Sequence, residues 1–494
     1  MMVITNQLVF VLLLQHSVSL GCEHLCQGND AKDHLKKMAS QKKEVWMLDQ
    51  RDTREGIGGG LLYVYDVDAL DRKKNATVID LAEAAEAAAC PIARRPHMMS
   101  AFDVFYSMKY VVISNVGSGD IQVLDTKTKK IIACLRTLKN GSLGGSVQNH
   151  YAEFTIDGKY IIVVDIGGRD LDSQLQSGYL HTVKFDCVSS ECTLTLIHSL
   201  ALSKYTEQLQ TTLARPICGG FDPRCSCHYF YLTLSEGGFI IANFTGHSME
   251  VLRAYGKEVV KGNGCGGARR FRHQNSMITN AATTGRIDAE DYLYLWNTVD
   301  ACRTRNASEW KDPVELELPK HTKVKDPTYD NTPYGNIPLG DTHGVATCVP
   351  KHGGKEMLLT FMRLSNEVFL VDPYQQKIVK RKSLANHAYA PNPTPDIATL
   401  LAEGGDRICF TMRGTHPVSV INKFVHSART PGIMCLHMAE DCRDFTLTQD
   451  DFYPTANEKY YDVSSDPHSI LLVVYEQDQA EPSSEEMRED EILD

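Results

Sequence analysis

Residues 96–125 read PHMMSAFDVFYSMKYVVISNVGSGDIQVLD. This stretch is rich in aromatic and β-branched residues and is interrupted by turns that carry glycine or asparagine, so it predicts short strands joined by tight turns. The same order of strand and turn recurs in segments 149–165, 215–242 and 342–372. A unit of this kind, repeated along a chain, is typical of the blades of a β-propeller.

Three more blades complete the count. Two are irregular and run from about residue 266 to 310 and from 394 to 436. The seventh is divided between the chain ends, because segments 44–48 and 61–66 lack an inner strand and segment 466–474 is an inner strand with nothing after it. We therefore predict an all-β fold, a seven-bladed β-propeller in which the C-terminal strand closes the first blade.

The chain ends predict the compartment. Residues 8–14 (LVFVLLL) form an apolar core followed by small residues, which indicates a signal peptide over 1–21 and a secreted, extracellular protein. A buried N-terminal strand is the alternative. We expect an N-terminal lead-in over 22–42, the propeller over 43–475 and an acidic, disordered tail over 476–494. No later stretch reaches the ~18 apolar residues of a membrane helix, so we expect no membrane span.

The charge is concentrated in the tail. Residues 476–494 hold nine acidic side chains and one Arg, so they supply −8 of the net charge of −11. We expect the tail to be solvated, with cation binding or partner recruitment as the alternative. No basic patch with interleaved aromatic residues is present, which argues against nucleic acid as a partner.

Cysteine usage agrees with secretion, since 15 Cys favour an oxidising compartment and an odd number leaves at least one without a partner in the chain. Cys187 and Cys192 flank a short turn and predict a disulfide across a hairpin; Cys435 and Cys442 could also close locally. A further cluster lacks the C-x-x-C spacing of zinc sites, so we favour disulfides over zinc there. Its residues are Cys218, Cys225, Cys227 and His228.

Four N-x-S/T sequons predict N-linked glycans on the surface of a secreted protein. They begin at Asn75, Asn140, Asn243 and Asn306.

Several short motifs lie at blade openings and turns. They are Pro96-His97, Pro467-His468, Asp157-Gly158-Lys159, residues 262–267 (GNGCGG), Asp341-Thr342-His343-Gly344, residues 395–417 and Thr430-Pro431-Gly432. With these motifs, residues 43–475 resemble the YVTN-type, lactonase-like family of secreted seven-bladed propellers. The resemblance implies the fold and leaves the activity open, because such propellers include lactonases, metal oxidoreductases and pure binding modules.

Propeller geometry locates a candidate site, because the residues that open each innermost strand face the central channel. These channel and ligand candidates are His468, His97, His150, Arg215, a turn at 266–267 near Arg269, His343 and Asp396. Four imidazoles and one carboxylate form a suitable ligand set for a copper or zinc ion, with Arg215 available to hold an anionic substrate group. The alternative is that these histidines bond only backbone carbonyls and water.

Three classes of function remain open. The first is a binding or scaffold module that uses the central channel and a loop face to hold a small molecule or an extracellular protein. The second is a metal-dependent oxidoreductase or lactonase-type hydrolase that uses the channel histidines. The third is a matrix component cross-linked through the odd cysteine.

Overall fold

The structure is a computed structural model, and it describes most of the chain between the two ends. The described residues are 41–50, 59–70, 75–91, 95–104, 107–137, 148–168, 174–188, 191–222, 228–262, 269–271, 276–282, 290–297, 306–319, 341–363, 365–384, 395–400, 406–413, 431–448, 451–455 and 465–476. The predicted signal peptide, most of the predicted lead-in, nearly all of the acidic tail and Asn140 lie outside these residues.

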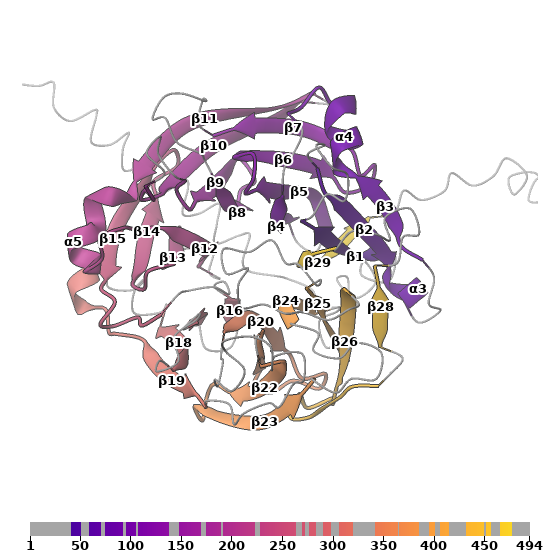
Figure 1. Cartoon of the computed structure of the whole chain (residues 1–494), viewed down its shortest axis with the longest axis vertical. Helices are drawn as coiled ribbons and strands as arrows, with labels where there is room; N and C mark the ends of the chain where they lie inside the picture. Colours follow the sequence, from indigo (N-terminus) through magenta and orange to yellow (C-terminus); the bar gives the residue numbers. More distant parts are fainter. Residues whose placement is uncertain are drawn as a thin grey trace, which may run out of the picture.

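The described strands form seven antiparallel sheets arranged as blades around a central axis (Figure 1). From the inner to the outer strand, blade 1 is β29 (Pro467–Glu476), β1 (Gln41–Asp49), β2 (Leu61–Asp66) and β3 (Thr77–Asp80). Blade 2 is β4 (Pro96–Val104), β5 (Ser107–Asn115), β6 (Asp120–Asp125) and β7 (Ile131–Arg136). Blade 3 is β8 (Asn149–Phe154), β9 (Tyr160–Asp165), β10 (Tyr179–Val188) and β11 (Glu191–Ala201). The predicted seven-bladed fold is confirmed.

The remaining blades follow the same inner-to-outer order. Blade 4 is β12 (Pro216–Phe221), β13 (Tyr229–Leu234), β14 (Phe239–Phe244) and β15 (Met249–Tyr255). Blade 5 is β16 (Arg269–Phe271), β17 (Ser276–Ala281), β18 (Asp291–Asn297) and β19 (Val314–Leu318). Blade 6 is β20 (Thr342–Cys348), β21 (Met357–Met362), β22 (Glu367–Asp372) and β23 (Lys377–Ser383). Blade 7 is β24 (Pro395–Leu400), β25 (Arg407–Met412), β26 (Gly432–Met438) and β27 (Phe445–Thr446), with β28 (Phe452–Pro454) also paired to β26.

Short helices lie outside the sheets. They are α3 (Val67–Leu70), α4 (Leu81–Ala87), η1 (Leu202–Tyr205), α5 (Thr206–Leu209) and η2 (Ala307–Glu309). Helix α4 is capped by Asp80, whose side chain accepts hydrogen bonds from the backbone N–H groups of Ala82 and Glu83 and so satisfies two donors of the first turn. No helix in the described part of the chain has the length and apolar composition that crossing a bilayer requires.

The chain ends close the ring as predicted. Strand β29 pairs antiparallel with β1, with Val45 opposite Leu472 and Met47 opposite Ile470. Because β29 is the innermost strand of blade 1, the two chain ends share one sheet and blade 1 has a full set of four strands (Figure 1). Strand β1 already begins at Gln41, at the end of the segment predicted as a lead-in.

The hydrophobic core is divided among the interfaces between neighbouring blades. Strands in the middle of a blade, such as β13 and β21, are buried along their whole length, so their sequences are almost continuously apolar. Outer strands alternate, as β11 does, because only one face packs against the protein. Between blades 6 and 7, for example, the rings of Phe361 and Phe410 lie 4.8 Å apart.

The inner strands share an irregularity that the sequence did not predict. The pairing between the inner strand and its neighbour shifts register near the start of the inner strand in six blades of the described structure. The bulged stretch contains His97 in β4, His150 in β8, His343 in β20, Asp396 in β24 and His468 in β29. Since a bulge re-aims a side chain out of the regular ladder, it explains how each of these residues reaches the channel.

Four disulfides join described cysteines. They are Cys90–Cys134, Cys187–Cys192, Cys348–Cys442 and Cys409–Cys435. The predicted hairpin disulfide is present, because Cys187 and Cys192 lie directly opposite each other in β10 and β11. The expectation that Cys435 and Cys442 close locally is wrong: β26 places Cys435 opposite Cys409 of β25.

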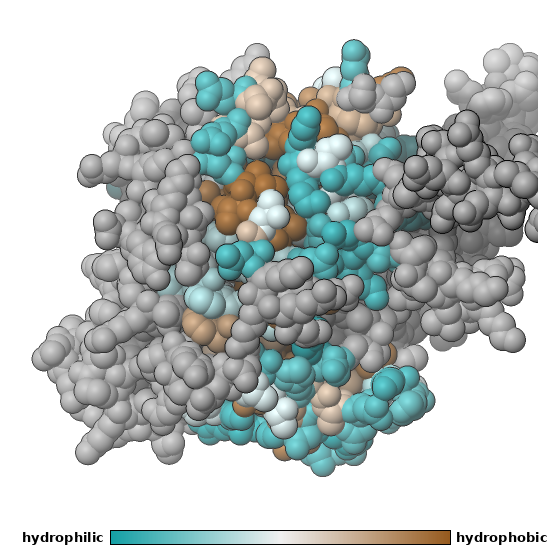
Figure 2. Space-filling view, turned by 90° about the vertical axis from the view of Figure 1, so that its right-hand side faces the viewer, coloured by the Kyte–Doolittle hydropathy of each residue, from teal (hydrophilic) through white to brown (hydrophobic). Residues whose placement is uncertain are grey.

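On one side of the ring, most of the described surface residues are hydrophilic (Figure 2). Figure 2 shows the side of the ring that lies to the right in Figure 1, where hydrophobic residues gather in a small area bordered by hydrophilic ones. Two of the three described sequon asparagines, Asn75 and Asn306, are exposed, and Asn243 is half-buried. Glycosylation at these positions stays a prediction.

Candidate functional site: a histidine and aspartate cluster in the central channel

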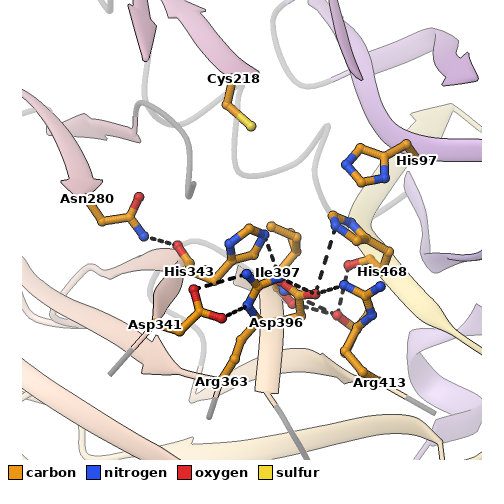
Figure 3. A network of polar contacts seen from close by, with 12 residues as sticks. His97, Cys218, Asn280, Asp341, His343, Arg363, Asp396, Ile397, Arg413 and His468 are labelled. Atoms are coloured by element: carbon orange, nitrogen blue, oxygen red, sulfur yellow. Dashed lines mark hydrogen bonds and ion pairs between the residues drawn. The ribbon is translucent and has the colours of Figure 1, made fainter. Parts of the chain in front are cut away.

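Five of the candidate residues meet at the centre of the ring, and Figure 3 shows three of them, His97, His343 and His468, around Asp396. Each of the five is the second residue of the inner strand of its blade, from blade 6 through blade 7 to blades 1, 2 and 3. His97, His343, His468 and Asp396 are buried, whereas His150 is half-buried. The fold therefore brings side chains from across the sequence to one place.

Asp396 and two histidines form the tightest group. The Nε2 atom of His343 lies 2.9 Å from Oδ1 of Asp396, and Nε2 of His468 lies 3.9 Å from Oδ2. One ligand atom from each of the three residues can be chosen so that all lie within 4.8 Å of one another. Two ligands bound at about 2.05 Å at the tetrahedral angle are about 3.3 Å apart, so His343 and Asp396, which lie at hydrogen-bond distance, would have to separate by a few tenths of an ångström to share an ion.

The other two histidines continue the group. Nε2 of His97 lies 2.8 Å from Nε2 of His150, and the ring of His97 lies 3.9 Å from the ring of His468, centroid to centroid. The sulfur of Cys218, from the bulge of β12, lies 3.9 Å from Nδ1 of His150. Four imidazole groups and the carboxylate of Asp396 thus line the channel from blade 6 to blade 3.

A buried ionic frame holds Asp396. Arg413 donates to Oδ2 of Asp396 at 2.6 Å and to Asp466 through two nitrogens, one at 2.8 Å. Arg363 donates to both oxygens of Asp341, at 2.8 and 3.0 Å, and its Nη1 lies 3.7 Å from Asp396. Each buried charge therefore faces an opposite one, as burial of ions requires.

The electrostatics keep the carboxylate ionised and the imidazoles neutral. Burial alone would raise the pKa of Asp396, but His343, His468 and the guanidinium groups of Arg363 and Arg413 outweigh burial and hold that pKa well below its usual range. Of these neighbours, only Arg363 and Arg413 stay positively charged over the whole physiological pH range.

Burial lowers the pKa of each of the four histidines, and neighbouring positive groups lower it further. For His150 the pKa falls to about 3. At neutral pH these rings are neutral, which is the protonation state that a metal ligand needs.

Several polar atoms of the cluster lack a hydrogen-bond partner within the described structure. They are the Nδ1 atoms of His97, His343 and His468. Buried polar groups are normally satisfied, and leaving one unsatisfied costs about 1–3 kcal/mol. Several such atoms at one place indicate a site built to contact something other than the protein.

Side chains from the second strand of a blade hold the histidine backbone of the next blade. Ser114 of β5 donates to the carbonyl of His150 at 2.9 Å, Thr411 of β25 donates to the carbonyl of His468 at 2.8 Å, and Asn280 of β17 donates to the carbonyl of His343. Sequence reasoning missed these groups. In the sequence, each of these groups is a single polar residue inside an otherwise apolar strand. One sequence alone does not distinguish such a residue from an ordinary buried polar side chain without this role.

Two predicted members of the site stand apart. Arg215 is buried just before β12, lies 3.4 Å from Glu236 and acts electrostatically on His150, while its Nε has no partner among the described groups. Arg269 begins β16, but its side chain and the turn at 266–267 lie outside what the structure describes. Sequence reasoning also missed Cys218 as a channel residue, together with the ionic frame.

The fold and the site define a seven-bladed β-propeller with a buried histidine and aspartate cluster in its channel. No protein-family model matches the sequence, and no curated protein matches it. Solved structures do match, at low sequence identity.

A hypothetical selenium-binding protein from Sulfolobus tokodaii matches with a TM-score of 0.59 and 11% identity, over 87% of this chain and 94% of that one. The periplasmic gluconolactonase of Pseudomonas aeruginosa matches with a TM-score of 0.47 and 11% identity, over 87% and 99%. AztD from Citrobacter koseri, in its apo form, matches with a TM-score of 0.43 and 10% identity, over 88% and 98%. At these identities the likeness concerns the fold alone.

Proposed function

We propose that this chain is a secreted metal-binding propeller that holds a copper or zinc ion in its central channel. The observation that carries the proposal is the group of His343, Asp396 and His468, which are buried, close together and left with polar atoms that no described group satisfies. An ion that binds Asp396 and one nitrogen of each histidine would take the place of several separate hydrogen bonds to water.

The donor set suits the proposed metals. Two neutral imidazoles and one carboxylate are ligands that zinc and copper accept, and the ionic frame around Asp396 orients the carboxylate as outer-shell partners do in metal sites. His97 lies against His468 and is placed to orient it or to join the ligand set. A bound ion would supply a Lewis acid in the channel.

The proposed role is that of a binding module which uses the channel and the surrounding loops to hold a small molecule or an extracellular protein. An enzymatic role, as a metal-dependent oxidoreductase or lactonase-type hydrolase, is the second candidate. It is favoured by a set of three protein ligands, which leaves a coordination position open for a substrate, as in catalytic zinc sites. Arg215 would then bind an anionic substrate group from the side of His150.

Secretion and membership of the YVTN-type group are part of the proposal. They are supported by the four disulfides, which suit an oxidising compartment, and by the exposed sequons at Asn75 and Asn306. Enzymatic deglycosylation of the protein from its own secretory pathway should lower its mass. An unchanged mass would contradict the surface assignment of the sequons.

Metal analysis of the purified chain tests the central claim. We expect about one copper or zinc ion per chain, and we expect the double variant His343→Ala, His468→Ala to lose it because two of three ligands are removed. The matched control is His352→Ala, whose imidazole is exposed on the surface beside Glu440. A wild-type chain that takes up neither ion after stripping and reloading, while its melting transition stays cooperative, would sink the proposal.

A further inference from the structure

The channel contains a second group of potential ligands, on the side opposite the ionic frame. We propose that Cys218 and His150 form a separate site for a soft monovalent ion, copper(I). The proposal does not depend on the ion assigned above to His343, Asp396 and His468, because it uses other atoms from blades 3 and 4. Figure 3 shows Cys218 at the top of the view, with its sulfur directed toward the middle of the channel.

The distance between the two donor atoms fits a shared ion. Sγ of Cys218 lies 3.9 Å from Nδ1 of His150. With bonds of about 2.3 Å to sulfur and about 2.0 Å to nitrogen, this separation corresponds to an angle of about 130° at the ion. Copper(I) accepts two or three ligands at wide angles, and thiolate donors select it.

The local structure holds the sulfur in place. Cys218 lies in the bulge of β12, one residue after the position that the histidines occupy in the neighbouring blades. The hydroxyl of Thr233 accepts a hydrogen bond from the Cys218 backbone N–H at 3.3 Å and donates to its carbonyl at 2.9 Å. Because both backbone groups are bound to one side chain of β13, the backbone of Cys218 is held in place before any ion binds.

The histidine is supported in the way that metal-bound histidines usually are. A metal-bound imidazole generally gives its other nitrogen to a hydrogen-bond partner, which fixes the tautomer. Nε2 of His150 lies 2.8 Å from Nε2 of His97, and Ser114 binds the His150 carbonyl at 2.9 Å. Nδ1 of His150 faces Cys218, and the backbone of Ile217 also forms a hydrogen bond with this imidazole, which an ion at Nδ1 would have to displace.

The charges favour a monovalent ion. A thiolate with copper(I) is neutral overall, and Cys218 is buried, so a neutral pair costs less to bury than a divalent ion with one thiolate. Arg215 already places positive charge near His150, which opposes a second divalent cation. By contrast, the other group contains the carboxylate of Asp396. The pair of Cys218 and His150, with its thiolate, therefore suits a soft ion, whereas the group of His343, Asp396 and His468, with its carboxylate, suits a harder one.

The test loads the stripped full-length chain with copper(I) under anaerobic conditions, using bicinchoninate as the competing chelator, and measures X-ray absorption at the copper edge. We expect one sulfur neighbour at about 2.3 Å. Cys218→Ser should remove that sulfur signal and weaken copper(I) binding at least about tenfold. His97→Ala should weaken binding about 10- to 100-fold while the sulfur signal remains, because His97 positions His150. His247→Gln, at an exposed turn, is the control and should change nothing.

The wild-type spectrum decides the question even if a variant fails to fold. Copper(I) bound only through nitrogen or oxygen, or bound as tightly in folded Cys218→Ser, overturns the inference. Zinc uptake measured on the same preparation reports separately on His343, Asp396 and His468. Loss of zinc binding with the sulfur signal present would overturn the proposed function and leave this inference standing.

Discussion

Replacing the half-buried imidazole of His150 with the amide of Gln should reduce the sensitivity of the metal-free protein to acid. Burial, the nearby His343 and the guanidinium groups of Arg215 and Arg363 lower the pKa of His150 to about 3. In the unfolded chain a histidine has a pKa of about 6.5, so between these two values the unfolded state binds the extra proton and acid favours unfolding. The stability that depends on neutral His150 is complete above pH of about 6.5 and is lost as the pH falls toward 3.

The size of the effect follows from the same two values. At pH 5, about 1.5 pH units below the pKa of an unfolded histidine, protonation stabilises the unfolded state by 1.36 kcal/mol per unit, or about 2 kcal/mol. This value is an upper limit, because His150 is only half-buried and solvent screens its charge. His150→Gln removes this term, so the loss in free energy of unfolding between pH 7 and pH 5 should shrink by up to about 2 kcal/mol.

Urea unfolding of the stripped chain at the two pH values measures the effect, and the control is the exposed His247→Gln. An acid-induced loss that is the same in wild type, His150→Gln and His247→Gln would refute the reasoning.

Two further predictions concern the ring. Deleting residues 466–494 removes the inner strand of blade 1 and should abolish the cooperative thermal transition, whereas deleting 477–494 should leave it unchanged; two similar melting curves would contradict the closure by β29. Gly344→Ala should lower the free energy of unfolding by about 1–3 kcal/mol and weaken zinc binding, because a Cβ there would lie 1.9 Å from the carbonyl oxygen of Asp396. Calorimetry measures the change in stability. An unchanged stability would contradict the prediction, since it would mean that blades 6 and 7 can move apart at this point.

Much of the fold could be predicted because each blade repeats a local pattern. The run Tyr110–Ser114 and the turn before Asp120 carry both the strand signal and the turn signal, and they correspond to β5 and β6. Closure could be predicted as well, since segment 466–474 reads as a strand without a partner nearby in sequence. The pairing of Cys435 with Cys409 could not, because a disulfide depends on which strands face each other and not on spacing along the chain.

The site was accessible to sequence reasoning only in part. Counting to the second residue of each inner strand locates the histidines and Asp396, because the repeat makes that position equivalent in every blade. Arg413 and Arg363 lie at the ends of apolar strands, where an arginine usually reaches solvent. Their roles depend on Asp466 and Asp341, which belong to other loops. Partners that are distant in sequence and bring no periodic pattern leave no signal in one chain.

The bulges at the start of the inner strands separate two demands on the same segment. The ladder on either side of a bulge keeps the regular pairing that the blade core needs, while the bulge itself lies at the channel end of the inner strand. The residue type at this position therefore decides what each blade contributes to the channel. Blades 2 and 3 present His97 and His150 there, blade 4 presents Cys218 and blade 7 presents Asp396. A ring built in this way can acquire a new chemistry one blade at a time.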